Sequence, residues 1–101
     1  MLIYKQQEVD NMILETPYEM ALGVAERFRA VRKAKKISLK EVTEKSGVPY
    51  STIRRFESKG EISFLALVKI TSAIGEDQEI SGLFAGHVPE SIEEVIRGNR
   101  R

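Results

Sequence analysis

The sequence predicts an all-α fold, a compact bundle of four to five short helices. Apolar residues between positions 17 and 84 recur three and four residues apart, which places them on one face of a helix. Helix-capping patterns begin several of these stretches, and none of them alternates apolar and polar residues as a half-buried strand would. With 101 residues, 42% of them hydrophobic, the chain has the length and composition of one small globular domain.

The first predicted helix spans about residues 17–35 and follows an N-terminal arm, residues 1–16. Thr16 can cap this helix, Pro17 suits its first position, and Glu19 completes a capping box with Thr16. We expect the apolar residues at helical spacing to face the core: Ala21, Val24, Ala25, Phe28 and Val31.

Two short helices follow in close succession. Ser38 and Glu41 form a second capping box, which begins a helix that ends at Gly47. The next helix spans about residues 49–57, and residues 58–62 form a loop. Five residues of this region should pack on the core: Val42, Thr43, Val48, Ile53 and Phe56.

A fourth helix, capped by Ser63 and stopped by Gly75, and a fifth over residues 78–84 complete the predicted domain, residues 17–84. Residues 85–101 form a tail, in which a last short helix could precede a basic end. One side of the fourth helix should line the core: Phe64, Leu67, Ile70, Thr71 and Ile74.

The charge is unevenly distributed along the chain. Residues 27–59 carry eleven Lys or Arg and three Glu, a net charge of +8, whereas residues 1–26 carry −4 and residues 60–101 carry −3. A basic middle between acidic ends would attract a polyanion such as nucleic acid. An ordinary solvated, lysine-rich surface would give the same pattern, so the charge alone does not decide between these two readings.

The chain lacks the residues that several classes of function need. The chain has no Cys, which excludes disulfides and cysteine nucleophiles, and its one His, His87, excludes a multi-histidine metal site. No glycine stands in a phosphate-loop spacing, and no Ser, His and acid form a credible catalytic set. We therefore expect no enzyme, no cofactor and no metal. The sequence shows neither a membrane-spanning run nor a secretion signal, so we expect a cytoplasmic protein.

Residues 38–57 combine two short helices and about three turn residues, the geometry of a helix-turn-helix. Thr43 lies where the two helices cross and must be small, and Gly47 permits the tight turn. The outward side chains of the second helix are then free to contact a partner: Pro49, Tyr50, Ser51, Thr52, Arg54 and Arg55.

This stretch resembles the Cro/CI-type, or Xre-type, helix-turn-helix family over about residues 22–75. The matching motifs are Val31-Arg32-Lys33, Ser38-Leu39-x-x-Val42-Thr43, Gly47-Val48-Pro49 and Ser51-Thr52-Ile53-Arg54-Arg55-Phe56-Glu57. The resemblance implies a lambda-repressor-like fold and sequence-specific DNA binding by a transcription regulator. It also implies that Glu57 pairs with Arg32 and steers the recognition helix. The motif residues with a structural role would then be Arg32, Thr43, Gly47, Ile53, Phe56 and Glu57.

The sequence departs from the family pattern at three positions. Leu39 replaces a Gln that usually reaches a phosphate and braces the recognition helix, so that contact has to come from a backbone N–H of Leu39 or Lys40 or from the Lys40 side chain. Thr43 replaces a slightly smaller Ala. Pro49 replaces a Ser and removes a side-chain cap.

The recognition helix, about 10–12 Å across, would fit the major groove of B-DNA. Arg54 and Arg55 can each donate two hydrogen bonds to guanine O6 and N7, or bind phosphates. Ser51 and Thr52 can reach base edges, and Tyr50 offers an aromatic face or packs on the preceding helix. The predicted DNA-binding residues are Leu39, Lys40, Pro49, Tyr50, Ser51, Thr52, Arg54, Arg55 and Lys59.

Proteins with this motif commonly bind palindromic double-stranded operators as two-fold homodimers. Surplus apolar residues for a dimer lie at Leu65, Val68, Ile80, Leu83 and Phe84. The small size, the lack of a ligand-sensing domain and the Ser-Ile-Glu-Glu-Val segment at 91–95 resemble antitoxins of the HipB or HigA type, which bind their own operator and a toxin protein. The alternative is an interaction module that keeps the helix-turn-helix as a scaffold and binds an acidic protein. The loss of the family Gln favours this alternative, and the +8 segment favours DNA.

Overall fold

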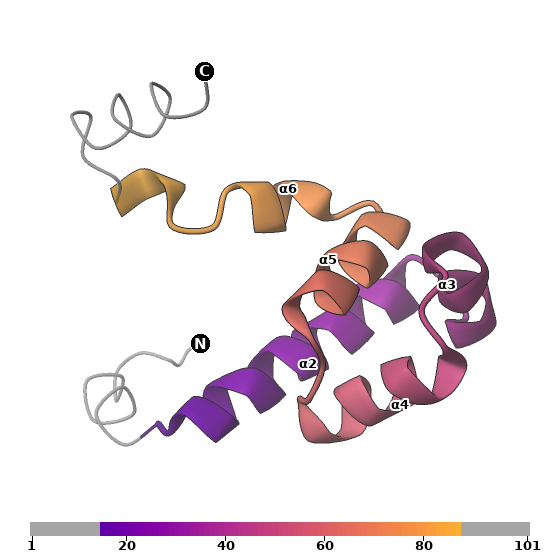
Figure 1. The fold of residues 1–101 in the computed structure, drawn as a ribbon, viewed down its shortest axis with the longest axis horizontal. Coiled ribbons are helices and arrows are strands. Elements are labelled where there is room, and N and C mark those ends of the chain that lie inside the picture. Colours follow the sequence, from indigo (N-terminus) through magenta and orange to yellow (C-terminus); the bar gives the residue numbers. More distant parts are fainter. Residues whose placement is uncertain (1–14, 88–101) are drawn as a thin grey trace.

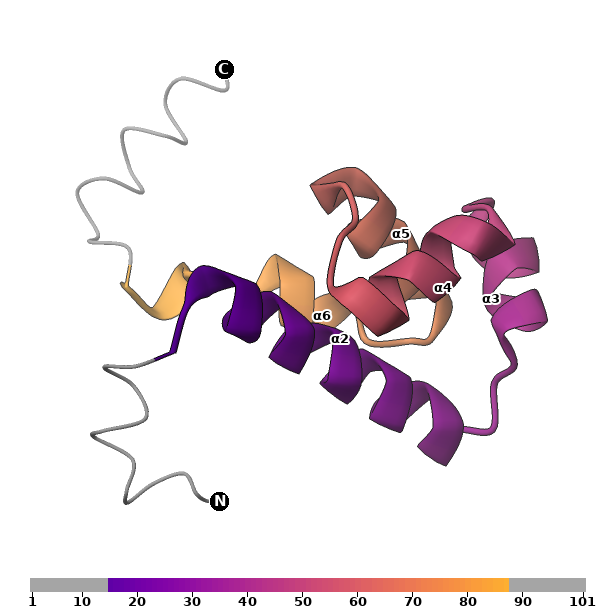
Figure 2. The same cartoon turned by 90° about the horizontal axis from the view of Figure 1, so that it is seen from below.

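The computed structural model describes residues 15–87 and confirms the all-α prediction for them. The predictions for most of the N-terminal arm, for the last helix and for the toxin-binding tail lie outside the described residues. Figures 1 and 2 show α3 and α4 together beside the C-terminal half of α2, with α5 crossing above them. The elements are α2 (Pro17–Ala34), α3 (Leu39–Ser46), α4 (Tyr50–Lys59), α5 (Phe64–Ala73), α6 (Asp77–Ser81) and a 3₁₀ helix (Ala85–His87).

The first two helices begin at the capping boxes that the sequence predicts. Thr16 Oγ1 accepts a hydrogen bond from the Glu19 N–H at 3.1 Å, and Glu19 Oε1 accepts one from the Thr16 N–H at 2.8 Å. Ser38 and Glu41 repeat this arrangement at the start of α3, also at 3.1 and 2.8 Å. Each box satisfies two backbone donors that a helix start would otherwise leave unpaired.

One hydrophobic core joins α2, α3, α4 and α5. The rings of Phe28 and Phe56 meet edge to face with centroids 5.6 Å apart, which links α2 to α4. Three predicted apolar core residues are outside this cluster: Phe64 is 61% exposed, Val24 is 40% exposed, and Ala21 is only half-buried. The buried apolar residues are Ala25, Phe28, Val42, Val48, Ile53, Phe56, Ile70 and Ile74.

The predicted ends of two helices were wrong. Ser58 and Lys59 continue α4 rather than form a loop, because the chain first adopts a left-handed conformation at Gly60, where φ is 73°. The helix predicted over 78–84 is only Asp77–Ser81, and Phe84 follows it in a turn with φ of 66°.

Lys35 links the C-terminal end of α2 to the C-terminal end of α5. Its Nζ donates a hydrogen bond to the main-chain oxygen of Ile74 at 2.7 Å and lies 2.7 Å from Glu76 Oε2. This lysine therefore satisfies a helix-end carbonyl instead of standing free in solvent. Among residues 15–87, none of the helices has the length and apolarity that crossing a membrane requires.

Candidate nucleic-acid interface

The turn between α3 and α4 is short and held on both sides. Gly47 takes a left-handed conformation, with φ of 77°, and its N–H donates to the Thr43 carbonyl at 2.8 Å. The next residue, Val48, is buried, and its N–H donates to Ser46 Oγ at 3.0 Å. Pro49 then precedes α4 without a side-chain cap. This turn sets α4 across α3.

The second helix of the motif, α4, packs on the core with one face and exposes the other face to solvent. Ile53 and Phe56 are buried in the core. Thr52 is half-buried, so it is less available than the sequence suggests. The other predicted outward residues are exposed, as are two flanking lysines: Pro49, Tyr50, Ser51, Arg54, Arg55, Lys40 and Lys59.

A buried ion pair fixes α4 to α2. Arg32 donates from Nε to Glu57 Oε2 at 2.8 Å and from Nη2 to Glu57 Oε1 at 3.0 Å. Its remaining nitrogen, Nη1, donates to the main-chain oxygen of Ile37 at 2.9 Å. Both side chains are only 8% exposed. Glu57 is therefore engaged in holding the helix and is not available to a ligand.

A recess of about 250 Å³ opens beside this ion pair, between α2, α4 and the start of α3. Two exposed guanidinium groups, Arg29 and Arg54, line it, and Arg29 Nε lies 3.8 Å from Glu57 Oε1. Leu39 lines it too, but this side chain is half-buried and packs against the core. The surplus positive charge of the recess suits a phosphate, and Arg29 takes a place there that the sequence analysis did not give it.

Arg55 makes an exposed ion pair with Glu61, a residue that the sequence analysis passed over. The hydrogen bonds from Nε and Nη2 to Glu61 Oε1 measure 3.0 and 2.5 Å. The two residues are six apart, and the left-handed turn at Gly60 lies between them. A carboxylate just beyond a helix-ending glycine was the signal that could have revealed the pair.

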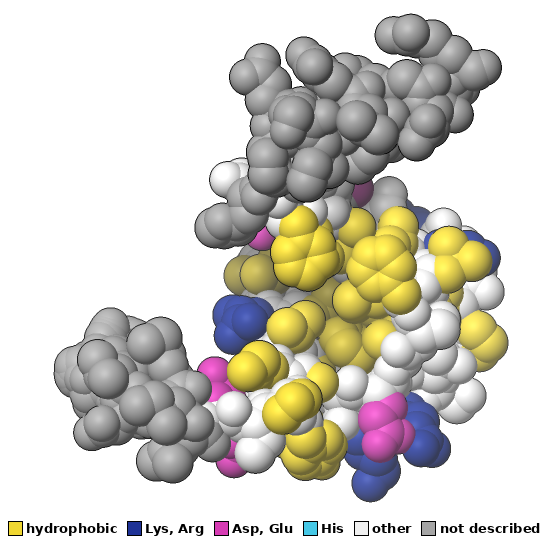
Figure 3. Space-filling model, turned by 60° about the vertical axis from the view of Figure 1, so that its left-hand side comes forward, with side chains coloured by type: hydrophobic (Ala, Val, Ile, Leu, Met, Phe, Trp, Pro, Cys, Tyr) yellow, Lys and Arg dark blue, Asp and Glu magenta, His cyan; other side chains and the backbone are white. Residues whose placement is uncertain are grey.

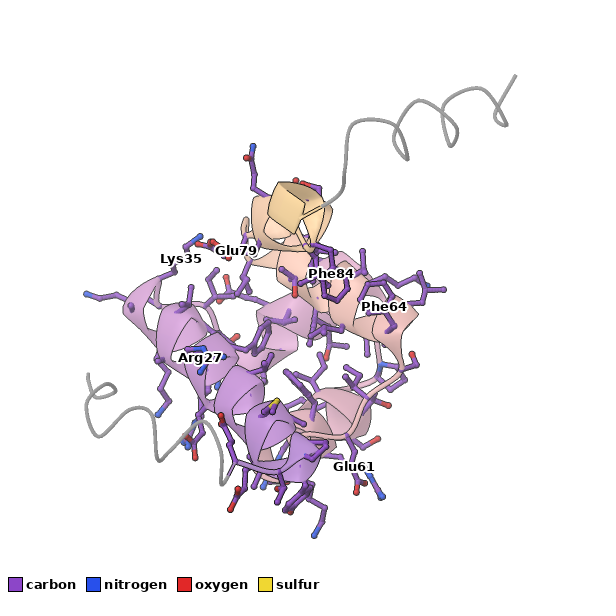
Figure 4. All side chains as sticks on the ribbon, turned by 90° about the vertical axis from the view of Figure 1, so that its left-hand side faces the viewer. Arg27, Lys35, Glu61, Phe64, Glu79 and Phe84 are labelled. Carbon is purple, nitrogen blue, oxygen red and sulfur yellow. The ribbon has the colours of Figure 1, made fainter. Side chains whose placement is uncertain are left out.

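The predicted dimer residues are only partly exposed. Leu65, Leu83 and Phe84 are 63%, 49% and 73% exposed, whereas Val68 and Ile80 are half-buried. Figure 3 shows apolar side chains gathered on one face of the molecule, and Figure 4 shows Phe64 and Phe84 near one another on the α5–α6 side of that face. The predicted dimer residues belong to α5, α6 and the turn after α6, not to α4.

Two features bear on the chemistry of the site. The backbone N–H of Ser38 holds the pKa of the Glu41 carboxyl below its usual value, which keeps this helix-capping group charged. Within residues 15–87, no cluster of three or more His, Cys, Asp or Glu side chains could hold a metal ion.

The comparisons with known proteins agree with this geometry. The chain matches the family model described as helix-turn-helix over residues 28–77, which includes α3, the turn and α4. A search of the curated proteins and a search of the solved structures found no match. Over these 50 residues, just under half of the chain, the protein is similar to the helix-turn-helix family.

Proposed function

We propose that this protein is a sequence-specific transcriptional repressor that inserts α4 into the major groove of a palindromic operator. The observation that carries the proposal is the outward side of α4, where Arg54 and Arg55 stand exposed while Ile53 and Phe56 hold the helix to the core. The helix lies within a segment of net charge +8, which would attract the phosphates of a duplex.

The rigidity of α4 supports specific binding. A buried ion pair, an aromatic contact and a short turn hold this helix at one angle to the body of the domain. A helix held in this way loses little conformational freedom when it binds, so more of its contact energy remains for affinity. The base-reading residues that we propose are Tyr50, Ser51, Thr52, Arg54 and Arg55.

Phosphate contacts around α4 would fix the register of the protein on the duplex. The family Gln is absent, and its replacement Leu39 packs against the core. We assign its role to the recess between Arg29 and Arg54, together with the exposed Lys40 at the start of α3. Lys59, at the end of α4, and the backbone beside Pro49 would complete the contacts.

A homodimer would give the repressor two recognition helices. One helix covers only a few base pairs, and two-fold dimers of such proteins read half-sites about one helical turn apart. We propose that residues 17–84 form the DNA-binding domain and that the apolar surface of α5, α6 and the turn after α6 forms the dimer contact. Its residues are Leu65, Val68, Ile80, Leu83 and Phe84.

The second candidate function is binding of an acidic protein, such as a toxin, by an antitoxin that represses its own operon. One observation favours it. Leu39 packs against the core and cannot make the polar contact of the family Gln. In this case the basic face would bind carboxylates instead of phosphates.

A binding experiment separates the two functions. Fluorescence anisotropy with duplexes from upstream of the gene should show tight binding to one of them, and the R54A/R55A variant should bind it no better than random DNA. Each lost bidentate contact should cost about 1–3 kcal/mol. The matched control is R27A/K33A, which removes two exposed charges from α2 and should retain the selectivity. A wild-type protein that binds no duplex selectively would favour the acidic partner.

A further inference from the structure

We infer that Glu61 determines the base specificity of this interface by holding Arg55 in the orientation that reads a guanine. This inference rests on the proposed function and adds to it a residue, a base and a mechanism. Its basis is the exposed pair between the recognition helix and the segment that follows it, in which both hydrogen bonds go to Glu61 Oε1.

The Glu61 carboxylate occupies one edge of the Arg55 guanidinium group and leaves another edge of that group free. Nε and one N–H of Nη2 point to Glu61 Oε1, at 3.0 and 2.5 Å. The guanidinium has five N–H donors in a fixed plane, so Nη1 and the second N–H of Nη2 remain available side by side. Two parallel donors at this spacing match O6 and N7 of guanine, and the other three bases offer no such pair of acceptors in the major groove.

Glu61 can hold Arg55 because its own segment is fixed. Gly60 packs so closely on α2 that a Cβ there would come within 3.0 Å of the Ala21 carbonyl carbon. On the other side, Ile62 is half-buried and packs against the core. The main chain of Glu61 between these two anchors therefore has a defined position, from which its carboxylate can hold an arginine that would otherwise sample many rotamers.

The pair is also placed where DNA can reach it. The side chains of Arg55 and Glu61 are 64% and 52% exposed. Figure 4 shows Glu61 below Phe64 and Phe84, at the outer edge of the molecule in that view.

The negative charge of Glu61 favours reading bases over binding phosphates. A lone arginine binds any phosphate and so adds affinity for every sequence. Beside a carboxylate, the net charge of the pair is zero, so the pair attracts a nearby phosphate less strongly than a lone arginine does. The loss of general affinity leaves the base contact as the main contribution of Arg55, which is how a repulsive element creates specificity.

The test compares base preferences across variants. Preferred duplexes are selected from a randomised pool with the wild type, and anisotropy at one salt concentration then measures binding to the selected duplex and to each single-base-pair change. We expect one guanine whose replacement by 7-deazaguanine, which lacks the N7 acceptor, weakens wild-type binding about tenfold or more. R55K should weaken the same contact, because an ammonium group cannot donate two parallel hydrogen bonds.

The E61A variant decides the inference. We expect it to lose the preference at that guanine, to keep its preferences at the other positions, and to bind random DNA as well as the wild type or better. E61Q, which keeps an oxygen acceptor, should retain part of the preference. The matched control is E44A, which removes an exposed carboxylate from α3 that has no ion pair among the described residues. Thermal unfolding by circular dichroism should be unchanged in these variants.

Other outcomes would overturn the inference that Glu61 orients Arg55. An E61A variant with an intact guanine preference would show that Arg55 orients itself. An E61A variant that binds every sequence more tightly and keeps the guanine preference would show that Glu61 only weakens binding in general. A wild-type protein with no sequence preference would overturn the proposed function itself, which is a different result from a selective wild type with an unaffected E61A variant.

Discussion

Glu57 of α4 accepts two hydrogen bonds from Arg32 of α2, and this ion pair fixes α4 to the longest helix of the described residues. Charged groups this deeply buried are costly to remove from water, and the pair compensates only when its hydrogen bonds are complete. Here Arg32 also reaches the Ile37 carbonyl at 2.9 Å. The pair therefore couples the angle of α4 to the turn between α2 and α3.

Removing Glu57 should destabilise the fold strongly. We expect E57A to lower the free energy of unfolding by about 3–5 kcal/mol, because it leaves the Arg32 guanidinium buried without a counter-charge. Urea unfolding followed by circular dichroism measures this change. The matched control is E61A, which breaks an exposed arginine–carboxylate pair and should cost less than about 1 kcal/mol. Equal effects of the two variants would contradict this account of the buried pair.

The buried hydroxyl of Thr43 should lower the stability of the fold, and a single substitution should remove this effect. Its Oγ1 is buried and has no hydrogen-bond partner among the described residues. Valine has nearly the same shape without the hydroxyl, so T43V should raise the free energy of unfolding by about 1–2 kcal/mol. Urea unfolding measures this change in the free energy of unfolding. The T43S variant, which keeps the hydroxyl and loses a methyl group, should be destabilised instead. A destabilised T43V variant would mean that the hydroxyl is hydrogen-bonded in solution.

Local signals in the sequence predict most of this fold, because they act within a few residues. The capping boxes at Thr16 and Ser38 and the left-handed turn at Gly47 all involve neighbours in the chain. Buried positions such as Ile53 and Phe56 follow from the helical period. These short-range features were enough to predict the fold class and the two helices of the motif.

Features that depend on neighbours far apart in the chain were harder to predict. Phe64 has the spacing of a core residue, but it occupies the first position of α5, and no periodicity reveals which helices cover that turn. Arg55 was predicted as a free outward cation, and its pairing with Glu61 depends on how α4 ends. The role of Lys35 likewise depends on the end of α5 lying beside the end of α2.

Two glycines with the same backbone conformation should tolerate alanine differently. Gly47 and Gly60 have φ of 77° and 73°, and each should lose about 1–2 kcal/mol on substitution because L-residues disfavour this region. At Gly47 nothing lies within 4 Å of the added Cβ, whereas at Gly60 the backbone of Ala21 and Leu22 lies 3.0–3.2 Å away. We expect G60A to cost about 1–3 kcal/mol more than G47A in urea unfolding. Equal costs would mean that the segment beside α2 shifts freely.

The stability of α3 should depend on pH through Glu41. The Ser38 backbone N–H lowers the pKa of this carboxyl below the ordinary value of 4.5. A lowered pKa in the folded state gives a stabilisation that is present above about pH 4.5 and is lost as the pH falls through the folded pKa. The melting temperature of the wild type should therefore exceed that of E41Q at neutral pH, and the difference should shrink toward about pH 3. A difference independent of pH would show that the charge of Glu41 does not matter.

The proposed dimer contact should be removable without unfolding the domain. Leu65 and Phe84 are 63% and 73% exposed, so changing them to serine should alter the stability of the monomer by less than about 0.5 kcal/mol. Burying the same side chains against a second copy would favour association, since apolar area contributes about 25 cal/mol per Å². Sedimentation equilibrium at micromolar concentration should give twice the monomer mass for the wild type and the monomer mass for L65S/F84S. M20S, which changes an exposed apolar residue in the first turn of α2, should remain dimeric. A wild type that sediments as a monomer would remove the basis for two recognition helices on one operator.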